Sequence, residues 1–337
     1  MGFAGTGLWA DVQEVPGALT ATLEAAEGVA QAADLLRGEG VERVVAIGNG
    51  AAYYVAHALW LASLESAAAP GPSLVAVPCG VAVGERFAWR SGDAVLAISS
   101  SGEFRDVVQV AQRGLARWCV AITADGRSSL ARAATATVLQ HVESQRAVTH
   151  TQALCGAYAI GLALWAEVGG DDSLAVASGA APEAAARAIG LAEAWAPDAL
   201  ADRTPPAAAV VAGGGTAWAA ALELALMLKE IARVPAEGVE TREGATSAMF
   251  GLDRGHLMVS LDPAGDALGD EALRLCAATG AETLQLPSVA GADPRLAPIT
   301  TLPASAALAA QLALAAGHDV DHPTWTNAYH ATARSAT

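Results

Sequence analysis

The chain has 337 residues, which is too long for one ordinary hydrophobic core and suits two domains of about 150 residues each. Acidic residues number 35 against 19 basic ones, for a net charge of −16. This balance argues against nucleic acid and anionic membrane as partners, since both need clustered Lys and Arg. Apolar residues make up 53% of the chain, and much of that is alanine. The longest apolar runs, 153–166 and 304–316, are shorter than the roughly 20 residues that span a bilayer, so they predict buried helices.

Cysteine and histidine usage predicts a cytoplasmic protein without a metal or cofactor. Cys79, Cys119, Cys155 and Cys276 form no CxxC pair, so we expect buried, reduced thiols. The seven histidines show no HExxH or similar ligand spacing. The turn at 48–52, GNGAA, lacks the third glycine of a dinucleotide fingerprint, and we expect no NAD. The N-terminus has no basic region followed by an apolar core, which predicts no export signal.

The first half of the chain alternates helix and strand. Residues 8–38 have helical spacing with a break at Pro16, and Gly38 and Gly40 end this segment. Apolar runs typical of buried parallel strands follow, separated by helical stretches. The predicted strands are 41–48, 73–80, 94–98, 118–124 and 136–142, and the predicted helices are 52–63, about 105–116 and 150–168. This alternation predicts a parallel sheet with helices on both faces.

The second half repeats this pattern after a small, glycine-flanked stretch, 171–190, which predicts a linker running into a helix. Residues 207–232 predict strand, glycine turn and helix; strands 256–262, 281–287 and 297–303 follow, with helices 268–279 and 304–317. We therefore predict an α/β fold of two tandem flavodoxin-like units. The predicted parts are a helical segment (1–38), a first domain (39–170), the linker, a second domain (191–318) and a tail (319–337) that lies across the site or across a partner subunit.

Residues 93–106, DAVLAISSSGEFRD, combine a buried strand, a hydroxyl-rich turn and the start of a helix. This geometry directs backbone N–H groups and the positive end of a helix dipole at one point. A phosphate or other anion can bind there, with Ser99, Ser100 and Ser101 as further donors. The alternative is a loop whose serines merely cap a helix.

Several spaced motifs point to one family. They are WADVQEVPGAL (9–19), GNGAAYYVA (48–56), AISSSGEFRD (97–106), ITADGRSSLARAAT (122–135), RAVTHTQAL (146–154), ALELALMLKEIARVPAEGVE (221–240) and the D-x-D-x-P of 319–323. Together they resemble the double sugar-isomerase (SIS) proteins, among them the isomerase domain of glucosamine-6-phosphate synthase and the fructosamine-phosphate deglycases. The resemblance implies a cytoplasmic homodimer with a phosphosugar site in the first unit, facing the second unit's helix.

The resemblance also implies which residues bind substrate. In the two turns these are Gly50, Ala52, Ser99, Ser100, Ser101, Glu103, Phe104 and Arg105, and elsewhere Glu143, Val148, Thr151, Gln152 and Thr246. The chain departs from the family where Phe104 replaces a threonine and Ala52 replaces a serine. A hydrogen bond to a charged group contributes about 1.5–3 kcal/mol, so losing two donors lowers phosphate affinity by roughly two orders of magnitude or more. Arg105 either compensates or is a solvated helix charge.

Glu230 matches the family carboxylate that moves a proton between adjacent sugar carbons through an enediol. The alternative is an ordinary helix glutamate beside Lys229. The tail residues His322 and His330 are candidate acids.

Other family chemistry is missing. The histidine of the family's H-G-P turn is replaced by Thr246-Ser247-Ala248, and the lysine two residues before the Lys229 position is Met227. Lys229 is the only lysine, which excludes Schiff-base chemistry at the tail. Gly2 follows Met1 in place of a nucleophilic cysteine, so we expect no glutamine amidotransfer.

These features predict a sugar or sugar-phosphate isomerase that acts through an enediol on a non-standard substrate. The alternatives are an amino-sugar deglycase or deaminase of the same family, and a non-catalytic carbohydrate-binding protein. The expected partners are a small sugar ligand and a second copy of the chain.

Overall fold

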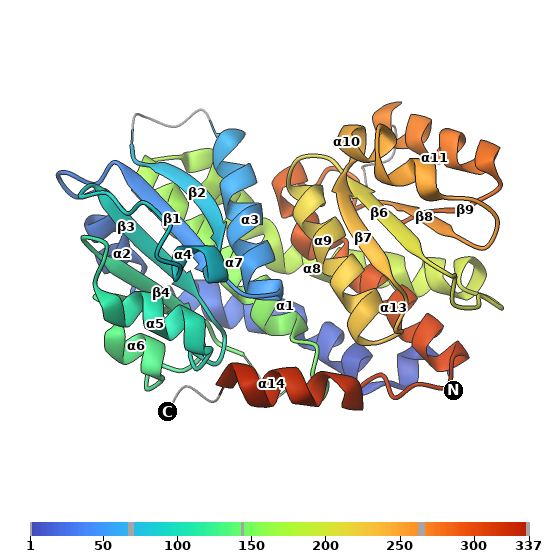
Figure 1. The fold of residues 1–337 in the computed structure, drawn as a ribbon, viewed down its shortest axis with the longest axis horizontal. Helices are drawn as coiled ribbons and strands as arrows, with labels where there is room; N and C mark the ends of the chain where they lie inside the picture. Colours follow the sequence, from blue (N-terminus) through green and yellow to red (C-terminus); the bar gives the residue numbers. More distant parts are fainter. Residues whose placement is uncertain (1, 67–70, 143–144, 262–266, 335–337) are drawn as a thin grey trace. The chain divides into compact units, whose positions relative to one another are not determined.

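The computed structural model describes residues 2–66, 71–142, 145–261 and 267–334 (Figure 1). The chain divides into two compact units, each assembled from separate stretches of sequence. We call them the five-stranded unit (17–143, 152–181 and 325–337) and the four-stranded unit (1–16, 144–151 and 182–324). Two of the dividing points fall inside α1 (Gly7–Ala25) and α8 (Asp172–Ala199), so these helices contribute to both units.

The five-stranded unit holds a fully parallel sheet with strand order β2-β1-β3-β4-β5. Its strands are β1 (Arg43–Gly48), β2 (Ser73–Pro78), β3 (Asp93–Ile98), β4 (Cys119–Thr123) and β5 (Ala136–Leu139). Its helices are α2 (Val29–Leu36), α3 (Ala51–Leu64), α4 (Cys79–Ala82), α5 (Arg105–Arg113), α6 (Ser129–Ala133), α7 (Thr151–Gly169) and the C-terminal α14 (Asn327–Arg334). All six residues of β3 are buried, as expected for a central strand covered on both faces. The strand order reverses between β1 and β3, since β2 is added beside β1 on one side and β4 and β5 beside β3 on the other. The carboxyl ends of β1 and β3 therefore form the switch point where such folds bind ligands.

The four-stranded unit holds a second parallel sheet, with order β7-β6-β8-β9. Its strands are β6 (Ala209–Gly213), β7 (Ala236–Glu240), β8 (Leu257–Ser260) and β9 (Glu282–Gln285). Its helices include α9 (Thr216–Glu230), α10 (Thr241–Ala245), α11 (Ala267–Thr279), α12 (Ala297–Thr300) and α13 (Leu302–Ala315), with short 3-10 turns η1 (Phe3–Gly5), η2 (Ala248–Gly251) and η3 (Pro294–Leu296). The predicted α/β fold of two parallel-sheet units is confirmed.

Glycine lets α9 lie directly on β7. A Cβ added at Gly238 would be 2.6 Å from both Cα and N of Leu222, so only glycine leaves room for the helix backbone. This contact fixes which side of α9 faces β7, and thereby the side on which its acidic residues lie.

Four local predictions were wrong. Residues 297–303 are helical, because Pro298 and Pro303 occupy the first turns of α12 and α13, where proline is favoured. The expected linker 171–190 is helical from Asp172, since its alanine-rich sequence favours helix. Pro16 lies within α1 and does not break it. The fourth error is an omission: β7 was not predicted, because AEGVE is a short edge strand with a glycine and two glutamates.

The most apolar helical stretch and the cysteines are mainly buried inside the protein. One described helical stretch, Pro294–Ala315, is long and apolar enough to cross a membrane, but 89% of its apolar 18-residue window is buried inside the protein, as in a core helix. Cys79, Cys155 and Cys276 are buried and Cys119 is partly buried, and all four are free thiols, as predicted from their spacing.

Candidate functional site

The serine loop at the end of β3 is held in shape by its own hydrogen bonds. Ser99 is buried, and its Oγ accepts a hydrogen bond from the Gly102 N–H at 3.1 Å. Ser101 Oγ accepts from the Glu103 N–H at 3.3 Å, and the Ser100 carbonyl accepts from the Ala124 N–H at 2.9 Å. The serines therefore stabilise the loop itself and do not cap α5, whose N-cap is Phe104. A hydroxyl that accepts one bond still has its own proton to donate, so Ser99 and Ser101 remain potential ligand donors.

Gly102 packs the loop against the start of α6. Its φ is +63°, a left-handed conformation, and an added Cβ would lie 2.1 Å from Oγ of Ser128. Ser128 caps α6 by accepting from the Ala131 N–H at 3.2 Å. Glu103, predicted to bind substrate, accepts from the Ser129 N–H at 2.7 Å through Oε1, so this carboxylate also supports the start of α6.

The N-terminus of α5 has N–H groups that attract anions and a carboxylate, Asp106, that repels them. Its first N–H groups have no side-chain cap at Phe104 and can face a ligand. Arg105 Nε, however, is 3.1 Å from Oδ1 of Asp106, which also lies in the first turn. The positive charge of Arg105 is therefore shared with a neighbouring carboxylate, and it only weakly replaces the missing hydroxyl donors.

The first glycine turn, 48–52, contributes backbone groups and the amide side chain of Asn49 to the candidate site. Gly50 has φ +55° and begins α3, where Ala52 supplies no hydroxyl. Asn49 follows β1 and lines a small cavity of about 80 Å³ together with Phe104, Arg105, Asp106, Tyr329, Thr332 and Ala333. This cavity lies at the switch point, where β1 and β3 end side by side.

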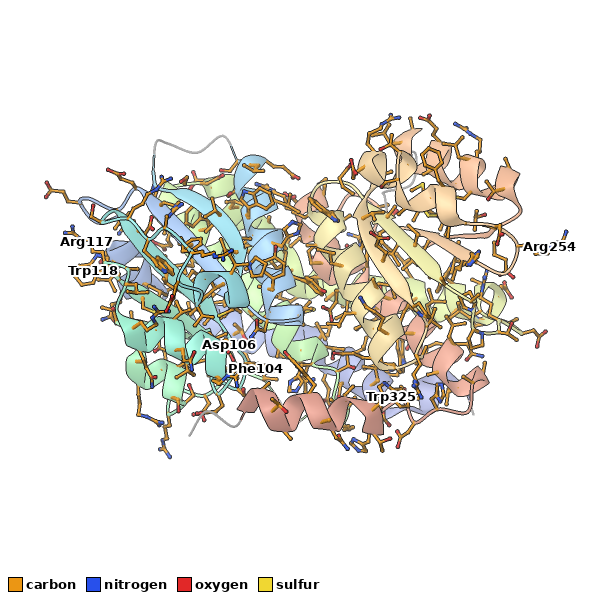
Figure 2. All side chains as sticks on the ribbon, viewed as in Figure 1. Phe104, Asp106, Arg117, Trp118, Arg254 and Trp325 are labelled. Atoms are coloured by element: carbon orange, nitrogen blue, oxygen red, sulfur yellow. The ribbon has the colours of Figure 1, made fainter. Side chains whose placement is uncertain are left out.

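The C-terminal helix α14 packs against α5 over this cavity (Figure 1). The rings of Tyr329 and Phe104 are 6.3 Å apart between centroids. Figure 2 shows Phe104 and Asp106 together at the start of α5, facing this helix. The tail helix α14 therefore lies beside Phe104 and Arg105, two residues of the predicted site. His330 belongs to α14, whereas His322 lies in the four-stranded unit, where its N–H donates to Asp319 Oδ1 at 2.9 Å.

The predicted base, Glu230, is the last residue of α9 and is half-buried. Burial raises the pKa of its carboxyl to about 6, although the neighbouring charge of Lys229 opposes this shift. A carboxyl with a pKa near neutral pH can both accept and return a proton.

A second carboxyl, Glu223, lies two turns earlier on α9, and the sequence analysis missed it. Only 6% of Glu223 is exposed, and its Oε2 has no hydrogen-bond partner among the residues described. Burial and the charge of Glu230 together raise its pKa to about 8. A glutamate inside the apolar run 219–228, seven residues before the predicted base, is a signal that could have identified it.

The remaining predicted residues have mixed surroundings. The Val148 N–H donates to the Asp321 carbonyl at 2.9 Å, which fixes the backbone of the segment before α7. Thr151 is fully buried with no partner for Oγ1 in the described ranges, and Gln152 is also buried. Thr246 is exposed, and its hydroxyl donates to the Glu243 carbonyl at 3.0 Å, a local role at the end of α10. Glu143 lies outside the described residues.

Gln140 is a further residue that the sequence analysis did not single out. It follows β5, at the carboxyl edge of the same sheet, and is 2% exposed. Neither of its side-chain polar atoms has a partner within the described chain. Within those same ranges, no group of three or more His, Cys, Asp or Glu side chains could hold a metal ion.

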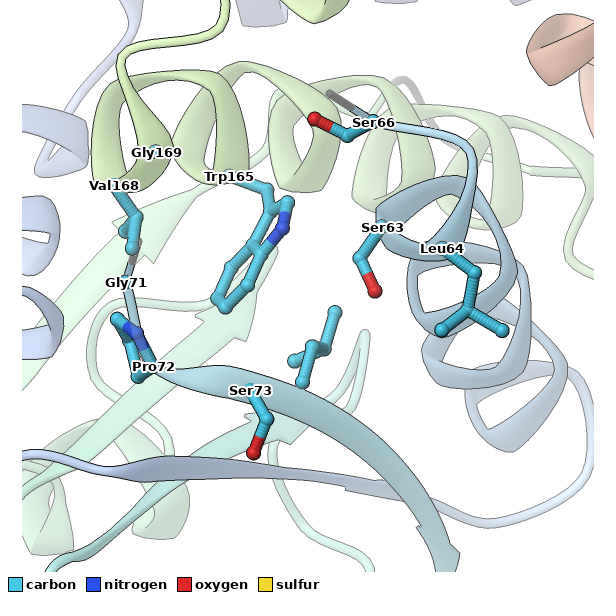
Figure 3. A pocket seen from close by; sticks show the side chains of 10 residues that line it. Ser63, Leu64, Ser66, Gly71, Pro72, Ser73, Trp165, Val168 and Gly169 are labelled. Carbon is cyan, nitrogen blue, oxygen red and sulfur yellow. The ribbon is translucent and has the colours of Figure 1, made fainter. Parts of the chain in front are cut away.

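A larger cavity of about 200 Å³ lies at the opposite, amino end of β2 (Figure 3). It is lined by the ends of α3 and α7, including Ser63, Leu64 and Trp165. Ser63 Oγ donates to the Trp60 carbonyl, and Ser66 bonds to the carboxylate of Asp171, so these hydroxyls already have partners. Ligands of such sheets bind at the carboxyl ends of the strands, which favours the switch point over this cavity.

Neither a protein-family model nor a curated protein sequence matches this chain. Solved structures do match. A proposed phosphosugar isomerase from Silicibacter pomeroyi DSS-3 is 26% identical, with a TM-score of 0.76 over 94% of this chain and 100% of that one. The C-terminal domain of glucosamine-fructose-6-phosphate aminotransferase from Francisella tularensis is 17% identical, with a TM-score of 0.76 over 95% and 100%. Tagatose-6-phosphate ketose/aldose isomerase from Escherichia coli is 16% identical, with a TM-score of 0.76 over 94% and 96%. The predicted resemblance to double SIS proteins is therefore confirmed as a shared fold.

Proposed function

We propose that the protein is a sugar or sugar-phosphate isomerase that transfers a proton between adjacent carbons through an enediol. The observation that carries this proposal is Glu230, a half-buried carboxyl whose pKa is raised to about 6 by burial. It stands at the position that matches the base of double SIS enzymes. Efficient general bases have a pKa close to the operating pH, and Glu230 meets this condition.

In the proposed reaction, ionised Glu230 removes a proton from the carbon beside the substrate carbonyl. The C–H electron pair forms the C=C bond of the enediol, and the carbonyl oxygen takes up a proton. Glu230 then returns its proton to the neighbouring carbon, while the second hydroxyl loses its proton and becomes the new carbonyl. Atoms and electrons balance without a cofactor. The shared fold with a ketose/aldose isomerase supports this reaction class.

The substrate we propose is not a standard hexose 6-phosphate. Ser99, Ser101 and the N–H groups at the start of α5 can hold a polyhydroxylated or weakly anionic end. Ala52 supplies no donor, and Arg105 shares its charge with Asp106. These contacts suit a hydroxyl-rich group better than a phosphate dianion.

We further propose that the protein is a cytoplasmic homodimer. The resemblance to double SIS proteins motivates the dimer, and the four free thiols support the location. Light scattering after size-exclusion chromatography measures the assembly directly, and a mass of one chain, 33.8 kDa, contradicts the dimer.

Deuterium exchange tests the chemistry. The protein is incubated in D2O with aldoses and ketoses, each with and without a phosphate group, and exchange beside the carbonyl is followed by NMR. We expect exchange by wild type, little by Glu230→Gln, and full exchange by Glu237→Gln. Glu237 is the matched control because it is an exposed carboxylate in the same unit, on β7. Exchange that persists in Glu230→Gln refutes the assignment of the base.

The same experiment separates the alternatives. Binding of a sugar without any exchange identifies a non-catalytic carbohydrate-binding protein. Exchange that is accompanied by release of an amine from an amino-sugar adduct identifies a deglycase or deaminase.

A further inference from the structure

Glu223 is a buried carboxyl, and the described elements that pack most extensively on its helix provide no counter-charge for it. The elements that pack most extensively on α9 are β6, β7, α12, α13 and η3. The strand β6 and both helices α12 and α13 contain no ionisable side chain. On β7, Glu237 is exposed and Glu240 accepts from the Glu243 N–H at 2.8 Å; both would repel a second anion.

The cations of η3 and of α9 itself do not neutralise Glu223 either. Arg295 of η3 is paired with Asp293, with Nη2 and Oδ2 2.6 Å apart. Lys229 is exposed and lies six residues away, which is about 120° around the helix from Glu223. One turn after Glu223, at the i+4 position where a cation could pair with it, stands the buried Met227.

The one ionisable partner on the same side of α9 is Glu230. Seven residues are almost two full turns, so the two side chains share a face and their Cα atoms are separated by about 10.5 Å along the axis. After burial, the charge of Glu230 is the second cause that raises the pKa of Glu223. Two carboxyls whose environments separate their proton affinities in this way are the usual arrangement of an acid and a base.

We propose that Glu223 is a positioning residue of the site: it keeps its proton while Glu230 is ionised, and so leaves Glu230 as the one anionic base on this face of α9. The role of Glu230 as base is the proposed function, on which this inference rests. A protonated Glu223 adds no charge that would oppose an anionic substrate or the negative charge that develops in the enediol step. When Glu223 ionises, the face gains that opposing charge, and Glu223 thereby sets the alkaline limit of activity.

Infrared spectroscopy tests the protonation state without turnover. A protonated carboxyl has a C=O stretch that an ionised carboxylate lacks, and the band is followed from pH 6 to pH 10. We expect a band in wild type at pH 7 that disappears around pH 8, is missing in Glu223→Gln and persists in the Glu237→Gln control. In Glu230→Gln, where the neighbouring charge is gone, the band should disappear at a lower pH. An identical protonated-carboxyl band in wild type and Glu223→Gln at pH 7 overturns the proposal.

The pH profile of deuterium exchange tests the consequence for activity. Wild type should lose activity below about pH 6 and above about pH 8. Glu223→Gln should also lose activity below about pH 6, but it should stay active above about pH 8. An unchanged alkaline limb in Glu223→Gln overturns the role. The infrared comparison of wild type with Glu223→Gln needs no substrate, so it decides the state of Glu223 even if the isomerase chemistry fails.

Discussion

The packing of Gly102 against Ser128 makes a quantitative prediction for the serine loop. Substituting Gly102 by alanine forces an L-residue into a left-handed conformation, at a cost of about 1–2 kcal/mol. The new Cβ would also lie 2.1 Å from Oγ and 2.4 Å from Cβ of Ser128. Relieving such a clash in a packed region costs about 1–3 kcal/mol more. We therefore expect Gly102→Ala to destabilise the protein by about 2–5 kcal/mol.

A second substitution separates the two contributions. Ser128→Gly removes both clashing atoms, and glycine at an N-cap costs only about a few tenths of a kcal/mol. The double variant Gly102→Ala/Ser128→Gly should therefore recover about 1–3 kcal/mol and keep only the backbone cost.

Urea unfolding of wild type, both single variants and the double variant gives the coupling energy between the two positions. The increase in the free energy of unfolding on adding sugar or inorganic phosphate, measured on the same four proteins, reports on ligand binding by the loop. Additive effects of the two substitutions, or a stability loss below about 0.5 kcal/mol in Gly102→Ala, would refute the described packing.

Three further outcomes are expected. Because the folded-state pKa of Glu223 is raised from 4.5 to about 8, wild type loses stability as pH rises through this window. Urea unfolding should thus show Glu223→Gln gaining up to about 5 kcal/mol over wild type between pH 4 and pH 8, and a pH-independent difference contradicts this. Arg43→Met leaves the fully buried Asp93 without the two bonds of 2.8 and 2.6 Å that it accepts from Arg43, so unfolding should show a loss of about 3–5 kcal/mol that a second change, Asp93→Asn, partly restores. Gly238→Ala drives a Cβ into the backbone of α9 and should lower the thermal midpoint, whereas Gly251→Ala, with open space around it, should not; equal midpoints would be inconsistent with the tight helix–strand contact.

The sequence predicts those parts of the fold whose signal is local. The strands β1, β3 and β4 are continuous apolar runs because both faces of a parallel sheet are covered. The edge strand β7 escapes this rule, because its partly exposed residues include glutamates. Residues 297–303 have β-branched residues at their centre, yet proline in the first turns of two helices decides the outcome.

In the candidate site, too, residues with a local sequence signal could be predicted, whereas residues whose role depends on packing could not. The Ser99–Ser101 turn is visible in the sequence, because it lies between a buried strand and a helix start. The capping role of Glu103 depends on where α6 begins, which the sequence does not indicate. Glu223 resembles any helix glutamate until the packing around it is known, since its missing counter-charge is a property of five other elements.

Each unit is built from three separate stretches of chain, and this has a consequence for biosynthesis. The five-stranded unit is incomplete until its last stretch, 325–337, has been translated, and the four-stranded unit until residue 324. Neither unit therefore has its full complement of residues until residue 324 has been translated. Strand pairing does not depend on these late residues, because β5 ends at Leu139 and β9 at Gln285. The late residues instead supply helices that cover the sheets, so each sheet can form before its unit is complete.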